Sequence, residues 1–85
     1  MKREEILLKV KGCIAKVLDM EEQYEEIEDK AVLYDDLGID SVDTIDLILE
    51  IESTFSIELS SDDTNFMKSV DSIVDKVEKI IRQRA

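Results

Sequence analysis

One serine, flanked by acids at the start of a helical segment, is the residue in this chain best suited to chemistry. Ser41 follows Leu37-Gly38-Ile39-Asp40 and precedes a strongly helical run. This spacing predicts that its hydroxyl lies at a helix N-terminus, where free backbone N–H groups and the helix dipole favour a negative group. A bound phosphate, or a phosphodiester formed on the serine oxygen, would be stabilised there. Gly38 is expected to permit a turn that a residue with a side chain would resist.

Two kinds of chemistry are disfavoured at this segment. The chain has no histidine, and Asp40 and Asp43 are weak bases for a serine alcohol, so we expect no enzyme and no catalytic residue. An EF-hand calcium loop also fails, because counting back from Gly38 places leucines at two positions that need acids. We therefore expect no metal site. Ser41 remains either a plain helix cap or a site of covalent attachment.

Composition bounds the class of protein. The chain has 85 residues, enough for one domain spanning residues 1–85, and its 11 basic and 22 acidic residues give a net charge of −11. This charge disfavours nucleic acid and anionic membranes as partners and favours proteins with basic patches, although it also serves solubility alone. Without a signal peptide or a long apolar run, we expect a cytoplasmic monomer that does not insert into membranes. Cys13 is expected to be a buried structural thiol.

Helical periodicity predicts the elements that position the serine. Apolar residues recur at helical spacing over about 3–18, over 41–55 and from Ser69 to Ile81, and Ser69 is a good N-cap. A short helix is expected over Ser60 to Met67. Ile57 and Leu59 alternate with polar residues, but a single strand there would have nothing to pair with. The prediction is an all-α, small four-helix bundle of three main helices and one short one, with a long loop between the first and second helices.

The connection over 19–40 is long for a compact domain and must be held down or mobile. Tyr34 could cover the edge of the residues that hold it. The acid density over 21–28 argues against an extra helical turn there. The apolar residues expected to pin the connection are Ile27, Leu33, Leu37 and Ile39.

The predicted helix over 41–55 has more apolar surface than one core contact requires. At about 100° per residue, a core stripe is formed by Thr44, Leu47, Ile48, Ile51 and Phe55. Away from this stripe lie a second apolar patch, consisting of Val42, Ile45 and Leu49, and an acidic edge, consisting of Asp43, Asp46 and Glu50. Either the long connection covers the second apolar patch, or the patch is a docking site in which apolar contacts supply affinity and acids supply steering.

These stretches resemble the acyl carrier protein family over nearly the whole chain. The resemblance is carried by Asp35-Asp36-Leu37-Gly38-Ile39-Asp40-Ser41, by Asp43-Thr44-Ile45-Asp46-Leu47, by Glu52 and Phe55, and by Ile57-Glu58-Leu59 and Ser69-Val70. It departs at Val42, where leucine is most often found in the family, and at Ser60, where proline is common.

The resemblance implies a carrier domain in which Ser41 receives 4′-phosphopantetheine from coenzyme A and the terminal thiol of this arm holds acyl groups as thioesters. It implies as partners a phosphopantetheinyl transferase and the acyl-transferring and synthase enzymes of fatty-acid or related, polyketide-type biosynthesis, which carry basic docking patches. The residues that it places at the partner interface are Asp40, Val42, Asp43, Ile45, Asp46, Leu49 and Glu52.

Two alternatives stay open at this point: an aminoacyl or peptidyl carrier, and an unmodified acidic interaction module. An acyl chain stored between the helices would need an apolar interior, but the residues that could line it are equally what an ordinary core uses, and plain packing is favoured. These residues are Ile48, Leu59, Phe66, Met67 and Val74.

Overall fold

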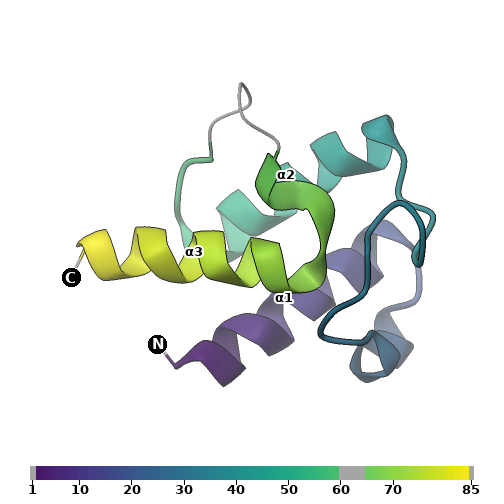
Figure 1. The fold of residues 1–85 in the computed structure, drawn as a ribbon, viewed down its shortest axis with the longest axis horizontal. Coiled ribbons are helices and arrows are strands. Elements are labelled where there is room, and N and C mark those ends of the chain that lie inside the picture. The colour runs from purple at the N-terminus through teal and green to yellow at the C-terminus, as the bar shows by residue number, and fades with distance from the viewer. Residues whose placement is uncertain (1, 60–64, 85) are drawn as a thin grey trace.

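Three α-helices make up most of the fold. The computed structural model describes residues 2–59 and 65–84. Its elements are α1 (Arg3–Val17), the 3₁₀ segment η1 (Glu21–Glu26), α2 (Ser41–Phe55), the 3₁₀ segment η2 (Asn65–Lys68) and α3 (Val70–Arg84) (Figure 1). The all-helical prediction is confirmed, and the three main helices lie where periodicity placed them. Within the described residues, no helix is both long and apolar enough to cross a membrane.

The short elements differ from the prediction. The fourth helix expected over Ser60 to Met67 is represented by the 3₁₀ turn η2, and residues 60–64 lie outside the described residues, so a four-helix count is not confirmed. The segment 21–28, for which no helical turn was expected, contains η1. A 3₁₀ helix closes each hydrogen bond over three residues, one fewer than an α-helix. A short acidic segment can therefore form such a turn against α1.

Local capping explains where α3 begins. The Ser69 hydroxyl accepts a hydrogen bond from the Ser72 N–H at 3.2 Å, and the Ser72 hydroxyl accepts one from the Ser69 N–H at 2.9 Å. This reciprocal pair satisfies backbone donors that the first turn leaves without helical partners. The prediction of Ser69 as the N-cap is confirmed.

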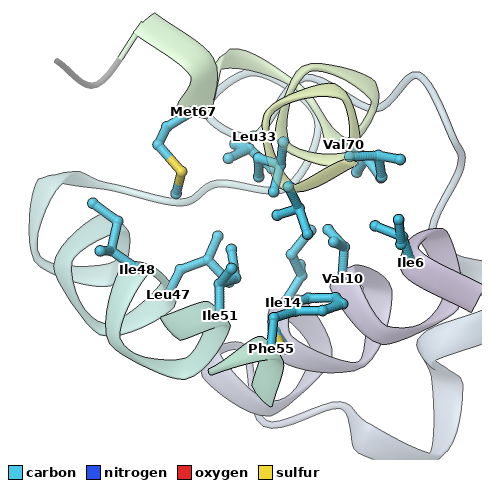
Figure 2. Packing of buried hydrophobic residues seen from close by; sticks show 14 of the residues in the cluster. Ile6, Val10, Ile14, Leu33, Leu47, Ile48, Ile51, Phe55, Met67 and Val70 are labelled. Carbon is cyan, nitrogen blue, oxygen red and sulfur yellow. The ribbon is translucent and has the colours of Figure 1, made fainter. Parts of the chain in front are cut away.

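The core forms where the apolar faces of the three helices meet. Figure 2 shows side chains of α1, of α2, of the long connection and of the start of α3 directed toward a common centre. Leu47, Ile48, Ile51 and Phe55 of the predicted core stripe are buried. Leu59, Met67 and Val74 are buried in the same core, as expected for packing, while the Phe66 side chain lies outside the described part. The side chains with the least solvent contact are Ile6, Val10, Ile14, Leu47, Ile51, Val70, Ile73, Val74 and Val77.

The long connection between α1 and α2 is pinned, not loose. Ile27, Leu33 and Ile39 are buried as predicted, and Leu37 packs on the core while partly exposed. Tyr34 does not cover them, because 74% of it is exposed. Ile57 and Leu59 are buried without forming a strand. The β-type backbone pairing found in the described residues involves other segments.

That pairing is an isolated antiparallel bridge between the connection and the start of α3. The Leu33 N–H donates to the Lys68 carbonyl at 3.0 Å, and the Val70 N–H donates to the Ala31 carbonyl at 3.0 Å. We call residues 31–33 and 68–70 the clasp. The clasp closes the connection over the core, so its backbone groups have partners although it is neither helix nor sheet.

A lysine on α1 fixes the connection from its other side. Lys11 is almost fully buried, and its Nζ lies 2.6 Å from the Asp29 Oδ1. The exposed Asp29 keeps one side of this pair in water, which limits the desolvation cost of the buried ammonium. Weaker ion pairs, Arg3 with Asp75 at 2.8 Å and Lys16 with Glu50 at 3.3 Å, link α1 to α3 and α2.

Candidate functional site

The N-terminus of α2 is capped by Asp40. Its backbone is extended, and its Oδ1 accepts a hydrogen bond from the Asp43 N–H at 2.9 Å. The Asp43 carboxylate accepts in return from the Asp40 N–H at 3.5 Å, which completes a capping box. The Thr44 hydroxyl donates to the Asp40 carbonyl at 2.8 Å. The alternative in which Ser41 is only the helix cap is therefore wrong, because the neighbouring aspartate does this work.

Ser41 is left as the exposed first residue of α2. Among the described residues, its hydroxyl has no hydrogen-bond partner, and the backbone N–H groups of Ser41 and Val42 have no acceptor. Such N–H groups at a helix start favour an anion. The carboxylates of Asp40 and Asp43 oppose part of this field. A phosphate on Ser41 would thus meet donors on the helix side and repulsion from the cap.

A tight turn sets the direction in which the chain enters α2. Gly38 has φ of 68°, and its N–H donates to the Tyr34 carbonyl at 3.1 Å. The Ile39 N–H donates to the Leu33 carbonyl at 2.9 Å, and the Ile39 side chain is buried. A Cβ at Gly38 would meet no atom within 4 Å, so the left-handed backbone and not crowding requires glycine. The prediction that Gly38 permits this turn is confirmed.

A pocket of about 850 Å³ opens directly beside Ser41. Its apolar wall is formed by Leu33, Ile39 and Met67, which also belong to the core. Sequence reasoning missed the residues that complete the pocket. The clasp brings them together, and no local sequence pattern predicts this pairing. They are Val32, Tyr34, Lys68 and Ser69. The pocket offers an extended, mainly apolar group attached to Ser41 a surface to lie on.

The second apolar patch is exposed. Val42, Ile45 and Leu49 expose 65%, 61% and 58% of their surface, so the alternative in which the connection covers them is wrong. The connection buries its own apolar side chains in the core instead.

Acidic side chains accompany the patch on α2. Asp46 is exposed, while Asp43 and Glu52 are half-buried and have internal partners. The Glu52 Oε2 accepts a hydrogen bond from the Leu59 N–H at 2.8 Å. Three of the acids expected at an interface therefore also hold the backbone in place: Asp40 and Asp43 at the start of the helix and Glu52 near its end.

Cys13 is remote from this chemistry. It is buried, and its Sγ lies 3.3 Å from the Thr54 Oγ1 where α1 packs on α2. Burial raises the pKa of the Cys13 thiol, against a smaller opposing effect of the Thr54 contact. The prediction of a buried thiol is confirmed, and the thiol form is the one that the fold favours.

Comparison with known proteins defines the class. A family model described as the phosphopantetheine attachment site matches residues 9–77. This match defines the chain as a phosphopantetheine-binding domain.

Individual relatives narrow the family. The acyl carrier protein of Thermotoga maritima is 39% identical over 77 residues, which cover 91% of this chain and 93% of that protein. The acyl carrier protein of Coprothermobacter proteolyticus is 36% identical over 78 residues, which cover 92% and 93%. A solution structure assigned to an acyl carrier protein of Anaplasma phagocytophilum has a TM-score of 0.75 at 31% identity, covering 93% of this chain and 91% of that one. The chain belongs to the acyl carrier protein family, and the cofactor of its domain is 4′-phosphopantetheine.

Proposed function

We propose that Ser41 is the attachment residue and that the protein holds acyl groups as thioesters on the 4′-phosphopantetheine arm. It presents them to partner enzymes of fatty-acid or related, polyketide-type biosynthesis. The single observation that carries this proposal is the exposed Ser41 hydroxyl, which the Asp40 cap leaves without a structural task.

The surroundings of Ser41 support attachment of an anionic arm. The Ser41 and Val42 N–H groups are available at the helix start, and the pocket beside Ser41 can receive an extended chain. Because Asp40 and Asp43 repel a phosphate, the arm is expected to leave the helix on the side away from the cap. The arm, when attached, supplies the thiol that the chain itself lacks at this surface.

The chain supplies the nucleophilic oxygen but not its base. It contains no histidine, and the Asp40 and Asp43 carboxylates are engaged in the capping box. A transferase must therefore take the Ser41 proton as the new O–P bond forms and the nucleotide part of coenzyme A departs. A chain that supplies the oxygen nucleophile while another enzyme supplies the base acts as a carrier and not as a catalyst.

Partner enzymes are proposed to dock on α2 next to the attachment point. The second apolar patch supplies contact area, and the acids around it, Asp40, Asp43, Asp46 and Glu52, complement basic patches. Because the chain has a net charge of −11, its association with basic partners is expected to be fast and to slow as the salt concentration rises. The phosphopantetheinyl transferase and the acyl-transferring and synthase enzymes would share this surface.

The direct test is intact mass after incubation with coenzyme A and a phosphopantetheinyl transferase. We expect the mass to increase by one phosphopantetheine per chain, and Ser41→Ala to abolish the increase. Ser53→Ala is the matched control, because Ser53 is an exposed serine of the same helix, and it should be modified like the unchanged protein. A mass increase in Ser41→Ala, or none in the unchanged protein with several active transferases, would contradict the proposal and favour an unmodified interaction module.

A further inference from the structure

One residue, Glu52, organises the chain that leaves α2. Its backbone carbonyl accepts from the Ser56 N–H and from the Ile57 N–H at 3.2 Å, at a helix end where Ser56 has φ of 55°. Its side chain accepts from the Leu59 N–H at 2.8 Å. The backbone carbonyl and the side chain of this single residue thus accept from three N–H groups within residues 56–59.

The segment held by Glu52 belongs to the core. Ile57 and Leu59 are 7% and 8% exposed, whereas Glu58 between them is exposed. A part-buried N–H that loses its acceptor is costly, more so when the acceptor is charged. The Glu52 carboxylate therefore stabilises the position in which Leu59 is buried.

The same carboxylate lies at the end of the second apolar patch. Glu52 follows Leu49 by three residues and Ile45 by seven, which places the three on one face of α2. A basic group that contacts this face comes within reach of a carboxylate with one oxygen already committed. Bidentate pairing with a guanidinium fixes the plane and direction of the whole carboxylate, so it competes with the orientation in which Oε2 accepts from the Leu59 N–H.

We propose that Glu52 couples docking on α2 to the segment 57–59: a guanidinium of a partner that pairs with Glu52 withdraws the acceptor from Leu59 and loosens the buried segment. This coupling rests on the proposed docking function. In the free protein Glu52 is a positioning residue, and in the complex it becomes the link between the surface and the core. A partner that contacts only the second apolar patch and the acids Asp40 and Asp43 leaves the hydrogen bond between Leu59 and Glu52 intact.

Amide hydrogen exchange at Leu59, followed by NMR, tests the internal half of the proposal. In the free protein, Glu52→Ala should accelerate this exchange by roughly 10- to 100-fold, the range that loss of a hydrogen bond to a charged acceptor implies. Glu52→Gln retains an acceptor oxygen and should retain most of the protection. Glu58→Gln, with the same charge change on the neighbouring exposed acid, should leave it unchanged. Equal exchange in Glu52→Ala and the unchanged protein would overturn the proposal.

The coupling is tested with a phosphopantetheinyl transferase bound to the Ser41→Ala protein, in which no turnover intervenes. At saturation, reported by amide shifts along α2, Leu59 exchange should accelerate by at least about tenfold while Ile14 of α1 stays protected. In the Ser41→Ala, Glu52→Gln double variant, binding should no longer alter Leu59. Saturation with unchanged Leu59 exchange overturns the coupling alone. Absence of α2 shifts with every transferase tried overturns the docking function and the coupling with it.

Discussion

Replacing Asp40 separates its capping role from its charge. In the structure its Oδ1 accepts the Asp43 N–H at 2.9 Å, and its carbonyl accepts the Thr44 hydroxyl. Loss of an N-cap acceptor costs about 1 kcal/mol, within a range of roughly 0.5–2 kcal/mol, whereas serine caps about as well as aspartate. Asp40→Ala should therefore lose about 1 kcal/mol of unfolding free energy and Asp40→Ser only a few tenths.

For a chain of this size, 1 kcal/mol corresponds to a fall in melting temperature of about 4–8 °C. Thermal unfolding followed by far-UV circular dichroism at moderate salt resolves such a difference. Removing one of 22 acids also relieves repulsion, so Asp46→Ala serves as the control, because Asp46 is exposed within the same helix. Asp46→Ala should melt at or slightly above the temperature of the unchanged protein.

Two results would refute this reasoning. If Asp40→Ala has the same melting temperature as the Asp46→Ala control, the capping box contributes nothing measurable to stability. If Asp40→Ser falls as far as Asp40→Ala, the charge and not the cap stabilises α2. Asp40→Ser should also be modified by the transferase more slowly than the unchanged protein at low salt, with the difference closing as salt screens the steering charge.

Three further predictions concern the surface, the buried thiol and the net charge. Leu49→Ala should change the unfolding free energy by less than about 0.5 kcal/mol and should weaken transferase binding. Leu47→Ala, at a buried position two residues earlier, should lower the unfolding free energy by about 2–5 kcal/mol. Equal losses of stability in the two variants would contradict a helix with one buried and one exposed apolar face. Because burial raises the pKa of Cys13, its protonated form stabilises the fold below the ordinary thiol pKa, and this contribution should be lost as the pH rises through the folded pKa. Denaturant unfolding at neutral and alkaline pH should therefore show a smaller alkaline loss in Cys13→Ala, and identical pH profiles would argue against the raised pKa. Finally, the melting temperature should rise between low and moderate ionic strength, because salt screens the repulsion within a chain of net charge −11; a melting temperature independent of salt would count against this.

The sequence predicts most of the helical framework because the information for it is local. Apolar spacing predicts the starts of α1, α2 and α3 within one residue, and Ser69 is correctly predicted as a cap. At α2 the cap was harder to assign, since aspartate and serine are both good N-caps and stand side by side. The acid Asp43, three residues after Asp40, is the local signal that favours a capping box at Asp40.

The connection over 19–40 could be predicted only in outline. Apolarity predicts the buried Ile27, Leu33 and Ile39 but not the buried Ala31. The segment η1, the Lys11–Asp29 pair and the clasp depend on residues distant in sequence. The same holds for the candidate site. Ser41 and its patch lie on one helix and follow from periodicity, whereas the pocket beside Ser41 includes Lys68 and Ser69, which tertiary pairing brings there.

The clasp gives assembly of this site an order in time. Its two hydrogen bonds join residues more than 30 positions apart, so they form only after α3 has arrived to meet the connection. During synthesis, the serine emerges from the ribosome well before the residues that build the far wall of its pocket. An enzyme or ligand that needs both walls of the pocket can therefore engage this site only after α3 has been synthesised and the clasp has closed.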